Sequence, residues 1–134
     1  MDHDFHRIFA QTRRIAVLGA HHDASRPAFY VPDYLYGRGY QILSVNPGLV
    51  GVQLWGEPVR ATLPEVGAVE MVNVFRRGES LMAHLPEILA MHPLPRVVWL
   101  QSGIFNREFA AVLEGRGVEV VQDRCALVER RRLG

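Results

Sequence analysis

Residues 13–47 read RRIAVLGAHHDASRPAFYVPDYLYGRGYQILSVNP, and this stretch decides the fold. An apolar run over residues 15–18 ends at Gly19. A polar loop, an amphipathic segment and a second apolar run ending at Asn46-Pro47 follow it. This order is typical of two parallel strands joined by a helical crossover. Such a unit places the first loop at the carboxyl edge of the sheet, where the next helix offers free N–H groups to a phosphate. The first loop is therefore the first candidate for a ligand site.

The first loop departs from the glycine pattern of NAD-binding proteins. That pattern needs G-x-G-x-x-G and an acidic residue that holds a ribose diol at the end of the second strand. Here the loop contains one glycine, Gly19, and the second strand ends in Asn46. Ser25 and Arg26 instead offer a hydroxyl and a bidentate phosphate donor, just before Pro27, which suits the first turn of a helix. The loop predicts phosphate binding without a ribose contact, and an ordinary strand-to-helix turn stays the alternative.

Composition narrows the class of protein. With 134 residues, of which 49% are hydrophobic and 22% charged, the chain is expected to form one globular domain over residues 1–134. The single cysteine, Cys125, excludes an internal disulfide framework, and residues 1–4 lack the pattern of a secretory signal, so we expect a cytoplasmic protein. The net charge of +1 and the absence of a long apolar stretch predict neither a nucleic-acid partner nor a membrane.

Apolar runs and amphipathic segments alternate along the chain. The runs rich in Val, Ile and Leu are expected to be buried strands, at residues 14–18, 41–45, 70–75, 96–100 and 118–121. The amphipathic segments are expected to be helices, at residues 4–12, 28–38, 78–91 and 106–116. Pro86 lies inside the third of these and indicates a start or a kink there. The pattern predicts an α/β, Rossmann-like, doubly wound sheet of mainly five parallel strands with helices on both faces.

The carboxyl ends of the predicted strands carry small, polar or basic groups. Arg76 and Arg77 directly follow the third strand, so they are candidates for neutralising a phosphate, with two solvated arginines as the alternative. Gly103 and Asn106 flank the start of a helix, which is either a second anion or amide site or a simple N-cap by Asn106. Phe75 is the better candidate for stacking on an adenine, because Trp99 lies within a strand and is expected in the core.

Eight short pieces follow one another over residues 14–129. They are Gly19 to Pro27, Gly39-Tyr40, Val45-Asn46-Pro47, Gly56-Glu57, Val74-Phe75-Arg76-Arg77, Trp99-Leu100-Gln101, Gly103 with Asn106, and Asp123-Arg124-Cys125. This set resembles the small stand-alone bacterial CoA-binding proteins, whose domain is similar to the N-terminal CoA-binding domain of the succinyl-CoA synthetase α subunit.

The resemblance implies that a Rossmann-like domain binds coenzyme A or an acyl-CoA as a non-catalytic carrier, sensor or partner module. It implies a set of cofactor-binding residues at the strand ends: Gly19, Ala20, His21, Ser25, Arg26, Pro27, Asn46, Pro47, Phe75, Arg76, Arg77, Gln101, Ser102, Gly103 and Asn106. A homodimer or a protein partner stays open.

The chain departs from this family pattern at several positions. The segment His21-His22-Asp23 stands where relatives usually carry small residues, so we expect a bulkier phosphate loop and reduced CoA affinity. Asn73 stands where an aspartate is usual, and Leu49 stands near a lysine of the synthetases. The synthetases also need a domain with a phosphorylated histidine, for which 134 residues leave no room, so ligase activity is not expected.

Three other interpretations remain open from the sequence. NAD or another nucleotide could occupy the same crevice, or the crevice could be vestigial in an interaction domain. An enzyme could use His21, His22 or Cys125, although adjacent histidines are a poor chelate and no metal site is predicted. Cys125 could also form a mixed disulfide with the CoA thiol. Residues 130–132, three arginines, are interpreted as a frayed basic tail.

Overall fold

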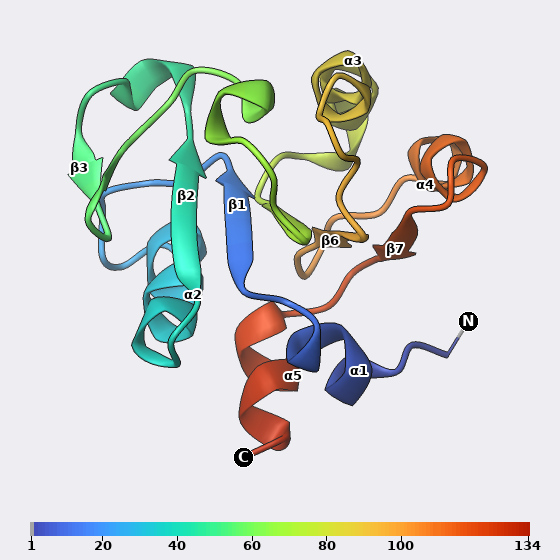
Figure 1. Ribbon diagram of the computed structural model, residues 1–134, viewed down its shortest axis with the longest axis horizontal. Helices are drawn as coiled ribbons and strands as arrows, with labels where there is room; N and C mark the ends of the chain where they lie inside the picture. Colours follow the sequence, from blue (N-terminus) through green and yellow to red (C-terminus); the bar gives the residue numbers. More distant parts are fainter. Residues whose placement is uncertain (1) are drawn as a thin grey trace.

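The computed structural model describes residues 2–134 and has a five-stranded parallel sheet at its centre (Figure 1). The strands follow the order β2-β1-β5-β6-β7 across the sheet. Their bounds are Arg14–Leu18 for β1, Gln41–Val45 for β2, Met71–Val74 for β5, Val97–Leu100 for β6 and Glu119–Val121 for β7. The predicted Rossmann-like α/β sheet with five parallel strands is confirmed.

The order of the strands reverses direction between β1 and β5. β1 pairs with β2 in the register Val17 with Ser44, and on its other side with β5 in the register Val17 with Asn73. The chain therefore leaves β1 toward one edge of the sheet and returns to build the other half. Loops that leave two neighbouring strands in opposite directions open a crevice at their carboxyl ends. The fold thus places a crevice between the loops after β1 and β5.

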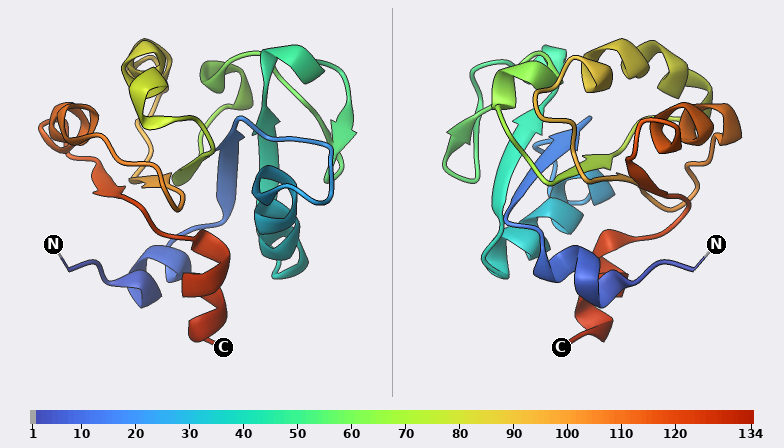
Figure 2. Two further views of the ribbon diagram at one scale, coloured as in Figure 1. Left: turned by 180° about the vertical axis from the view of Figure 1, so that it is seen from behind. Right: turned by 45° about the vertical axis from the view of Figure 1, so that its right-hand side comes forward.

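Helices cover both faces of the sheet, as Figures 1 and 2 show from three directions. One face carries α1 (Phe5–Ala10), α2 (Pro27–Gly37) and α5 (Ala126–Arg132). The other carries α3 (Leu85–Leu89), α4 (Arg107–Glu114) and the 3₁₀ segments η2 (Leu63–Val66) and η3 (Gly78–His84). Side chains alternate between these two layers, because successive residues of a strand point to opposite faces. All four residues of β5 and of β6 are buried, as expected for strands covered on both sides.

The third expected helix, at residues 78–91, is split into η3 and α3. Pro86 occupies the first turn of α3, where its missing N–H breaks no helical hydrogen bond, so the proline marks a start and not a kink. Within residues 2–134 no helix is both long and apolar enough to cross a membrane; α2, the longest, has 11 residues.

Other segments were not expected from the sequence. A short hairpin pairs β3 (Gln53–Leu54) with β4 (Glu57–Pro58), and η1 (Pro47–Leu49) follows β2.

The expectation of a frayed basic tail is wrong. Residues 130–132 lie in α5, and Arg130 Nε donates a hydrogen bond of 3.0 Å to the Tyr40 hydroxyl. Arg132 pairs with the buried Glu129 at 3.2 Å. The helix begins directly after Cys125, and its buried Ala126 packs with Trp99, whose side chain is fully buried as expected. These contacts hold the end of the chain against the sheet.

Candidate functional site

Gly19 joins the loops that follow β1 and β5. Its φ of +88° lies in the left-handed region that favours glycine, and its N–H donates to the Val45 carbonyl at 2.9 Å. A Cβ atom at this position would stand 3.0 Å from the Phe75 carbonyl oxygen and 3.2 Å from Arg76 Nε. The first loop therefore lies directly against the residues that follow β5, and only a residue without a side chain permits this approach.

Asp23 organises the rest of the first loop. Its Oδ1 accepts hydrogen bonds from the Ser25 backbone N–H at 3.0 Å and from the Ser25 hydroxyl at 2.7 Å. Its Oδ2 lies 3.8 Å from Arg26 Nε. The backbone and hydroxyl hydrogen bonds from Ser25, followed by the nearby charge of Arg26, lower the pKa of Asp23. The charged carboxylate thus holds Ser25 and Arg26 at the start of α2.

The first turn of α2 presents a free donor toward the loop. Pro27 occupies the first helical position, as expected, and has no N–H. The N–H groups of Phe29 and Tyr30 both donate to the Arg26 carbonyl at 2.9 Å. The N–H of Ala28 has no hydrogen-bond partner in the part of the chain that the structure describes. An unpaired N–H at the N-terminus of an 11-residue helix is suited to bind an anion.

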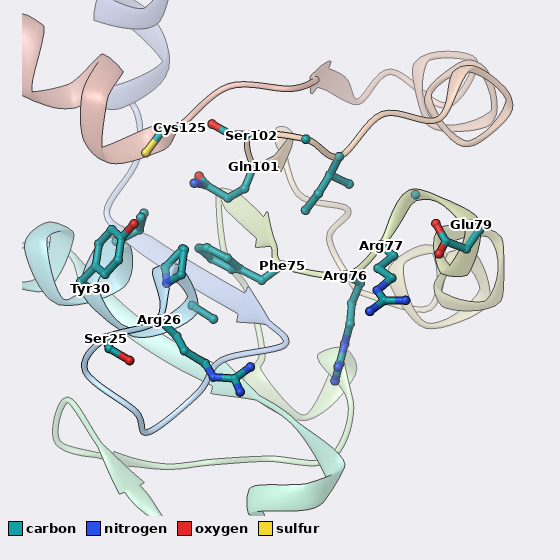
Figure 3. A pocket seen from close by; sticks show the side chains of 16 residues that line it. Ser25, Arg26, Tyr30, Phe75, Arg76, Arg77, Glu79, Gln101, Ser102 and Cys125 are labelled. Atoms are coloured by element: carbon teal, nitrogen blue, oxygen red, sulfur yellow. The ribbon is translucent and has the colours of Figure 1, made fainter.

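A pocket of about 550 Å³ lies where the loops after β1, β5 and β6 meet (Figure 3). This volume is in the range of roughly 300–1,000 Å³ that is usual for small-molecule sites. Its lining consists of Ser25, Arg26, Pro27, Ala28, Tyr30, Val31, Phe75, Arg76, Arg77, Gly78, Glu79, Gln101, Ser102, Gly103, Ile104 and Cys125.

The positively charged groups of the pocket come from two loops. Arg26 extends from the first loop, with 62% of its side chain exposed, and Arg76 and Arg77 extend from the loop after β5. Figure 3 shows the guanidinium groups of Arg26 and Arg76 on one side of the pocket, away from Gln101 and Cys125. Arg76 Nε is buried and has no hydrogen-bond partner among residues 2–134. A buried donor of this kind is expected to gain from an anionic ligand.

Gly78 brings the loops after β5 and β6 together. A Cβ atom on Gly78 would lie 2.6 Å from the Phe105 carbonyl oxygen. Asn106 Nδ2 donates to the Gly78 carbonyl at 2.9 Å, and Asn106 Oδ1 accepts from the Phe109 N–H at 2.9 Å at the start of α4. Both ends of the Asn106 side chain are therefore used within the protein. Asn106 is the N-cap that the sequence allowed, and it lies outside the pocket lining.

Asn46 braces the first loop from the neighbouring strand end. Its Nδ2 donates to the Ala20 carbonyl at 2.8 Å, and its Oδ1 accepts from the Gly48 N–H at 2.9 Å. The structure thus ties the turn after β2 to the first loop.

The sequence-predicted site residues fall into two sets. Those that the structure brings together in the pocket lining are Ser25, Arg26, Pro27, Phe75, Arg76, Arg77, Gln101, Ser102 and Gly103. Those that lie outside it are Gly19, Ala20, His21, Asn46, Pro47 and Asn106.

Sequence reasoning missed several lining residues. Tyr30 and Val31 follow Pro27 by three and four residues, so helical spacing could have placed them near the first turn. Glu79 adds a carboxylate to the pocket, and no pattern in the sequence pointed to it. Cys125 was considered as a nucleophile and as a disulfide partner of the CoA thiol, but it was not among the predicted cofactor-binding residues. It reaches the pocket because α5 begins there.

The two histidines of the first loop pack against each other. The rings of His21 and His22 are stacked, with centroids 4.8 Å apart and an angle of 9° between the planes. His21 Nδ1 accepts a hydrogen bond of 2.9 Å from the Asp23 N–H. Neither ring lines the pocket. Among residues 2–134, no cluster of three or more His, Cys, Asp or Glu residues could hold a metal ion.

Comparisons with known proteins find a family and several solved structures that are similar to this chain. Residues 13–131 match the CoA binding domain family. The uncharacterized protein YneT of Bacillus subtilis (strain 168) is 33% identical over 122 residues, which cover 90% of this chain and 87% of YneT. A solved structure of cell-free ID.343 from Thermus thermophilus has 48% identity and a TM-score of 0.92, covering 96% of both chains. A hypothetical protein from Pyrococcus horikoshii OT3 has 27% identity and a TM-score of 0.87, covering 97% of this chain and 90% of that one. The chain belongs to the CoA binding domain family.

Proposed function

We propose that this protein binds coenzyme A or an acyl-CoA in the pocket at the carboxyl ends of β1, β5 and β6. The observation that carries the proposal is the gathering of three arginines, Arg26, Arg76 and Arg77, around one pocket at the point where the strand order reverses. CoA carries its charge on a pyrophosphate and a 3′-phosphate, and guanidinium groups bind phosphate oxygens in bidentate pairs. Membership of the CoA binding domain family supports this choice of ligand.

The pocket's two sides suggest how the ligand lies. The phosphates bind at the arginine side, where the Ala28 N–H and the start of α2 add donors. The pantetheine arm extends along Phe75 and Ile104 toward Gln101, because these side chains line the rest of the pocket. Asn46-Pro47 borders the adenosine end through the hydrogen bond that ties this turn to the first loop.

We propose a non-catalytic role, as a carrier, a sensor or a partner module. Two observations favour it. The histidines of the first loop stack on each other outside the pocket lining. The pocket lining contains three arginines, one carboxylate, one tyrosine and one thiol, and no hydrogen bond or ion pair joins an acid of this lining to a base among the described residues.

NAD is the main competing ligand. NAD-binding proteins hold the ribose diol with a carboxylate at the end of the second strand. Here β2 ends at Val45, and the next side chain, Asn46, already accepts from the Gly48 N–H and donates to the Ala20 carbonyl. The strand end therefore favours CoA over NAD.

Thermal unfolding with CoA, acetyl-CoA, NAD and ATP tests the proposal. A ligand at a hundred times its Kd adds about 2.7 kcal/mol to the free energy of unfolding, which raises Tm by roughly 8 °C in a chain of this size. We expect this rise with CoA or acetyl-CoA. Arg26→Ala and Arg76→Ala should reduce it, whereas Arg107→Ala, an exposed arginine on α4 outside the pocket lining, should not.

Two results would argue against CoA. A rise with NAD or ATP alone would assign a different nucleotide to the pocket. No rise with any of the four ligands would favour an interaction domain whose pocket is vestigial.

A further inference from the structure

Gln101 presents the NH₂ half of its side-chain amide to the pocket. Its side chain lines the pocket and is only 4% exposed. Its Oε1 accepts two hydrogen bonds, from Asn73 Nδ2 at 3.0 Å and from the Ala126 N–H at 2.9 Å. Two donors on one side fix the amide with its oxygen turned inward, so its NH₂ group is left for the pocket. That NH₂ group has no hydrogen-bond acceptor in the described chain.

An NH₂ group in a pocket wall that makes no hydrogen bond to the described residues is suited to a ligand that supplies an acceptor. The group is a donor only, so the ligand atom must be an acceptor such as a carbonyl oxygen. The pantetheine arm of CoA contains two amide carbonyls. The outer one is separated from the sulfur by an N–H and two methylene groups.

Cys125 lies next to this recognition point. The Ala126 N–H that donates to Gln101 belongs to the peptide that follows Cys125, so one hydrogen bond joins the amide to the cysteine backbone. Cys125 is a free, half-buried cysteine in the lining of the same pocket (Figure 3). Ser102, another lining residue, is exposed, so this end of the pocket is open to solvent.

We propose that Cys125 exchanges with the disulfide form of coenzyme A and holds one CoA covalently in the pocket. The proposal rests on the proposed function, because the nucleotide half must bind at the arginines. The Gln101 NH₂ group binds the outer amide carbonyl of the arm. The short spacer between this carbonyl and the sulfur then brings the sulfur to Cys125.

The exchange is balanced without another oxidant. The Cys125 thiolate attacks the nearer sulfur of CoA disulfide, and a new sulfur–sulfur bond forms as the old one breaks. The second CoA leaves as a thiolate and takes up the proton that Cys125 lost. A free thiol reverses the reaction by the same step. The protein thereby responds to the ratio of CoA disulfide to CoA thiol, with one CoA bound per chain and no turnover.

Intact-mass measurement after incubation with CoA disulfide tests the step. We expect one CoA adduct per chain, removed by dithiothreitol and absent in Cys125→Ser. Oxidised glutathione and pantethine, the disulfide of the arm without its nucleotide, serve as comparison reagents. The reaction with CoA disulfide should be at least tenfold faster than with pantethine, and Arg26→Ala should remove this advantage. Equal rates with all three disulfides, or no adduct on the folded protein, would overturn the proposal.

Gln101→Glu tests the recognition point with little change in shape. The variant keeps an acceptor for Asn73 and Ala126 and replaces only the NH₂ group that faces the pocket. We expect a tenfold slower exchange with CoA disulfide, while the rate with oxidised glutathione stays within twofold. Equal slowing with both reagents would show a general change at Cys125 and would contradict the role of the amide. Thermal unfolding of the variant confirms that it is folded.

The failure of this proposal and of CoA binding itself can be told apart. If Cys125→Ser still shows the rise in Tm with CoA and the natural protein forms no adduct, only the exchange is wrong. If no variant shows a rise with CoA and the exchange rates do not depend on the nucleotide, both proposals fail.

Discussion

Gly19 and Arg76 approach each other closely across the point where the sheet reverses its order: a Cβ atom added to the glycine would stand 3.2 Å from Arg76 Nε. The same Nε is buried without a partner. The first loop therefore positions an arginine of the neighbouring loop. Under the proposed function, phosphate binding at Arg76 would depend on a residue that offers no side chain to the pocket.

Gly19→Ala should disrupt the site and the fold together. The left-handed φ alone costs about 1–2 kcal/mol with a side chain, and the Cβ atom also displaces Arg76 or the Phe75 carbonyl. We expect a larger loss of stability than this range and a reduced Tm rise with CoA.

Gly39→Ala is the matched control. Its φ of +99° is equally left-handed, but nothing lies within 4 Å of its Cβ position. It should lose about 1–2 kcal/mol and keep the full CoA response. Equal CoA responses in both variants would contradict the positioning of Arg76 by Gly19.

Gly78→Ala should separate the loops after β5 and β6. The Cβ atom would meet the Phe105 carbonyl oxygen at 2.6 Å, so the backbone must shift, at a cost of roughly 1–3 kcal/mol. Gly37→Ala, within α2 and with nothing within 4 Å, should instead stabilise the protein by up to about 1 kcal/mol. Chemical denaturation of both variants measures the two shifts, and a tolerated Gly78→Ala would show that the loops do not need this contact.

Asp23→Asn should strengthen CoA binding. The variant keeps an oxygen for the Ser25 N–H and removes the negative charge that lies 3.8 Å from Arg26. A phosphate then no longer competes with a carboxylate for this arginine. We expect calorimetry to give a severalfold lower Kd at low salt, with the gain shrinking as salt screens the charges.

Glu108→Gln on α4 makes the same change of charge at an exposed position outside the pocket lining. It should leave the Kd unchanged. Weaker binding in Asp23→Asn would show that the carboxylate organises the loop more than it repels the ligand.

Protonation of Glu119 should make the protein less stable in acid. Burial acts to raise the pKa of this carboxyl, but the hydrogen bonds from Arg7 at 2.8 Å and His3 at 2.7 Å outweigh it, so the pKa is lowered from 4.5. A lowered pKa in the folded state contributes stability above the unfolded value, and that contribution is lost as the pH falls through the folded value.

Glu119→Gln should therefore be less stable than the natural protein at pH 7. The difference in the free energy of unfolding should shrink below about pH 4.5. Denaturant unfolding across this range measures it. Glu114→Gln, at an exposed carboxylate without an ion pair in the described residues, should show no such trend. A difference that stays constant into acid would contradict the assignment to the ion pairs of Glu119.

The sequence predicted the sheet well because its strands are short apolar runs with clear ends. The bounds of β1 and β2 were predicted to the residue, since Gly19 and Asn46 stop the two runs. The last helix was missed because its buried face consists of Ala126 and Glu129 and not of large apolar residues. Glu129 is 7% exposed and pairs with Arg132, so the charged sequence of this helix gives no sign that one of its faces is buried.

The candidate site was partly predictable for a related reason. Parallel strands bring their carboxyl ends to one edge, so the loops after β1, β5 and β6 could be grouped from topology alone. The direction of each side chain could not. Asn106 is used as a helix cap, and Cys125 reaches the pocket only because α5 folds back onto the sheet. Both facts depend on contacts between segments that are distant in the chain.

The position of α5 in the chain affects when the pocket can exist during synthesis. Gln101 needs the Ala126 N–H to hold its oxygen inward, and Trp99 donates to the Arg124 carbonyl at 2.8 Å. Both partners follow the last strand, so a ribosome releases every strand of the sheet before the chain can orient this amide. A nascent chain is therefore expected to form its sheet before it acquires a complete ligand site.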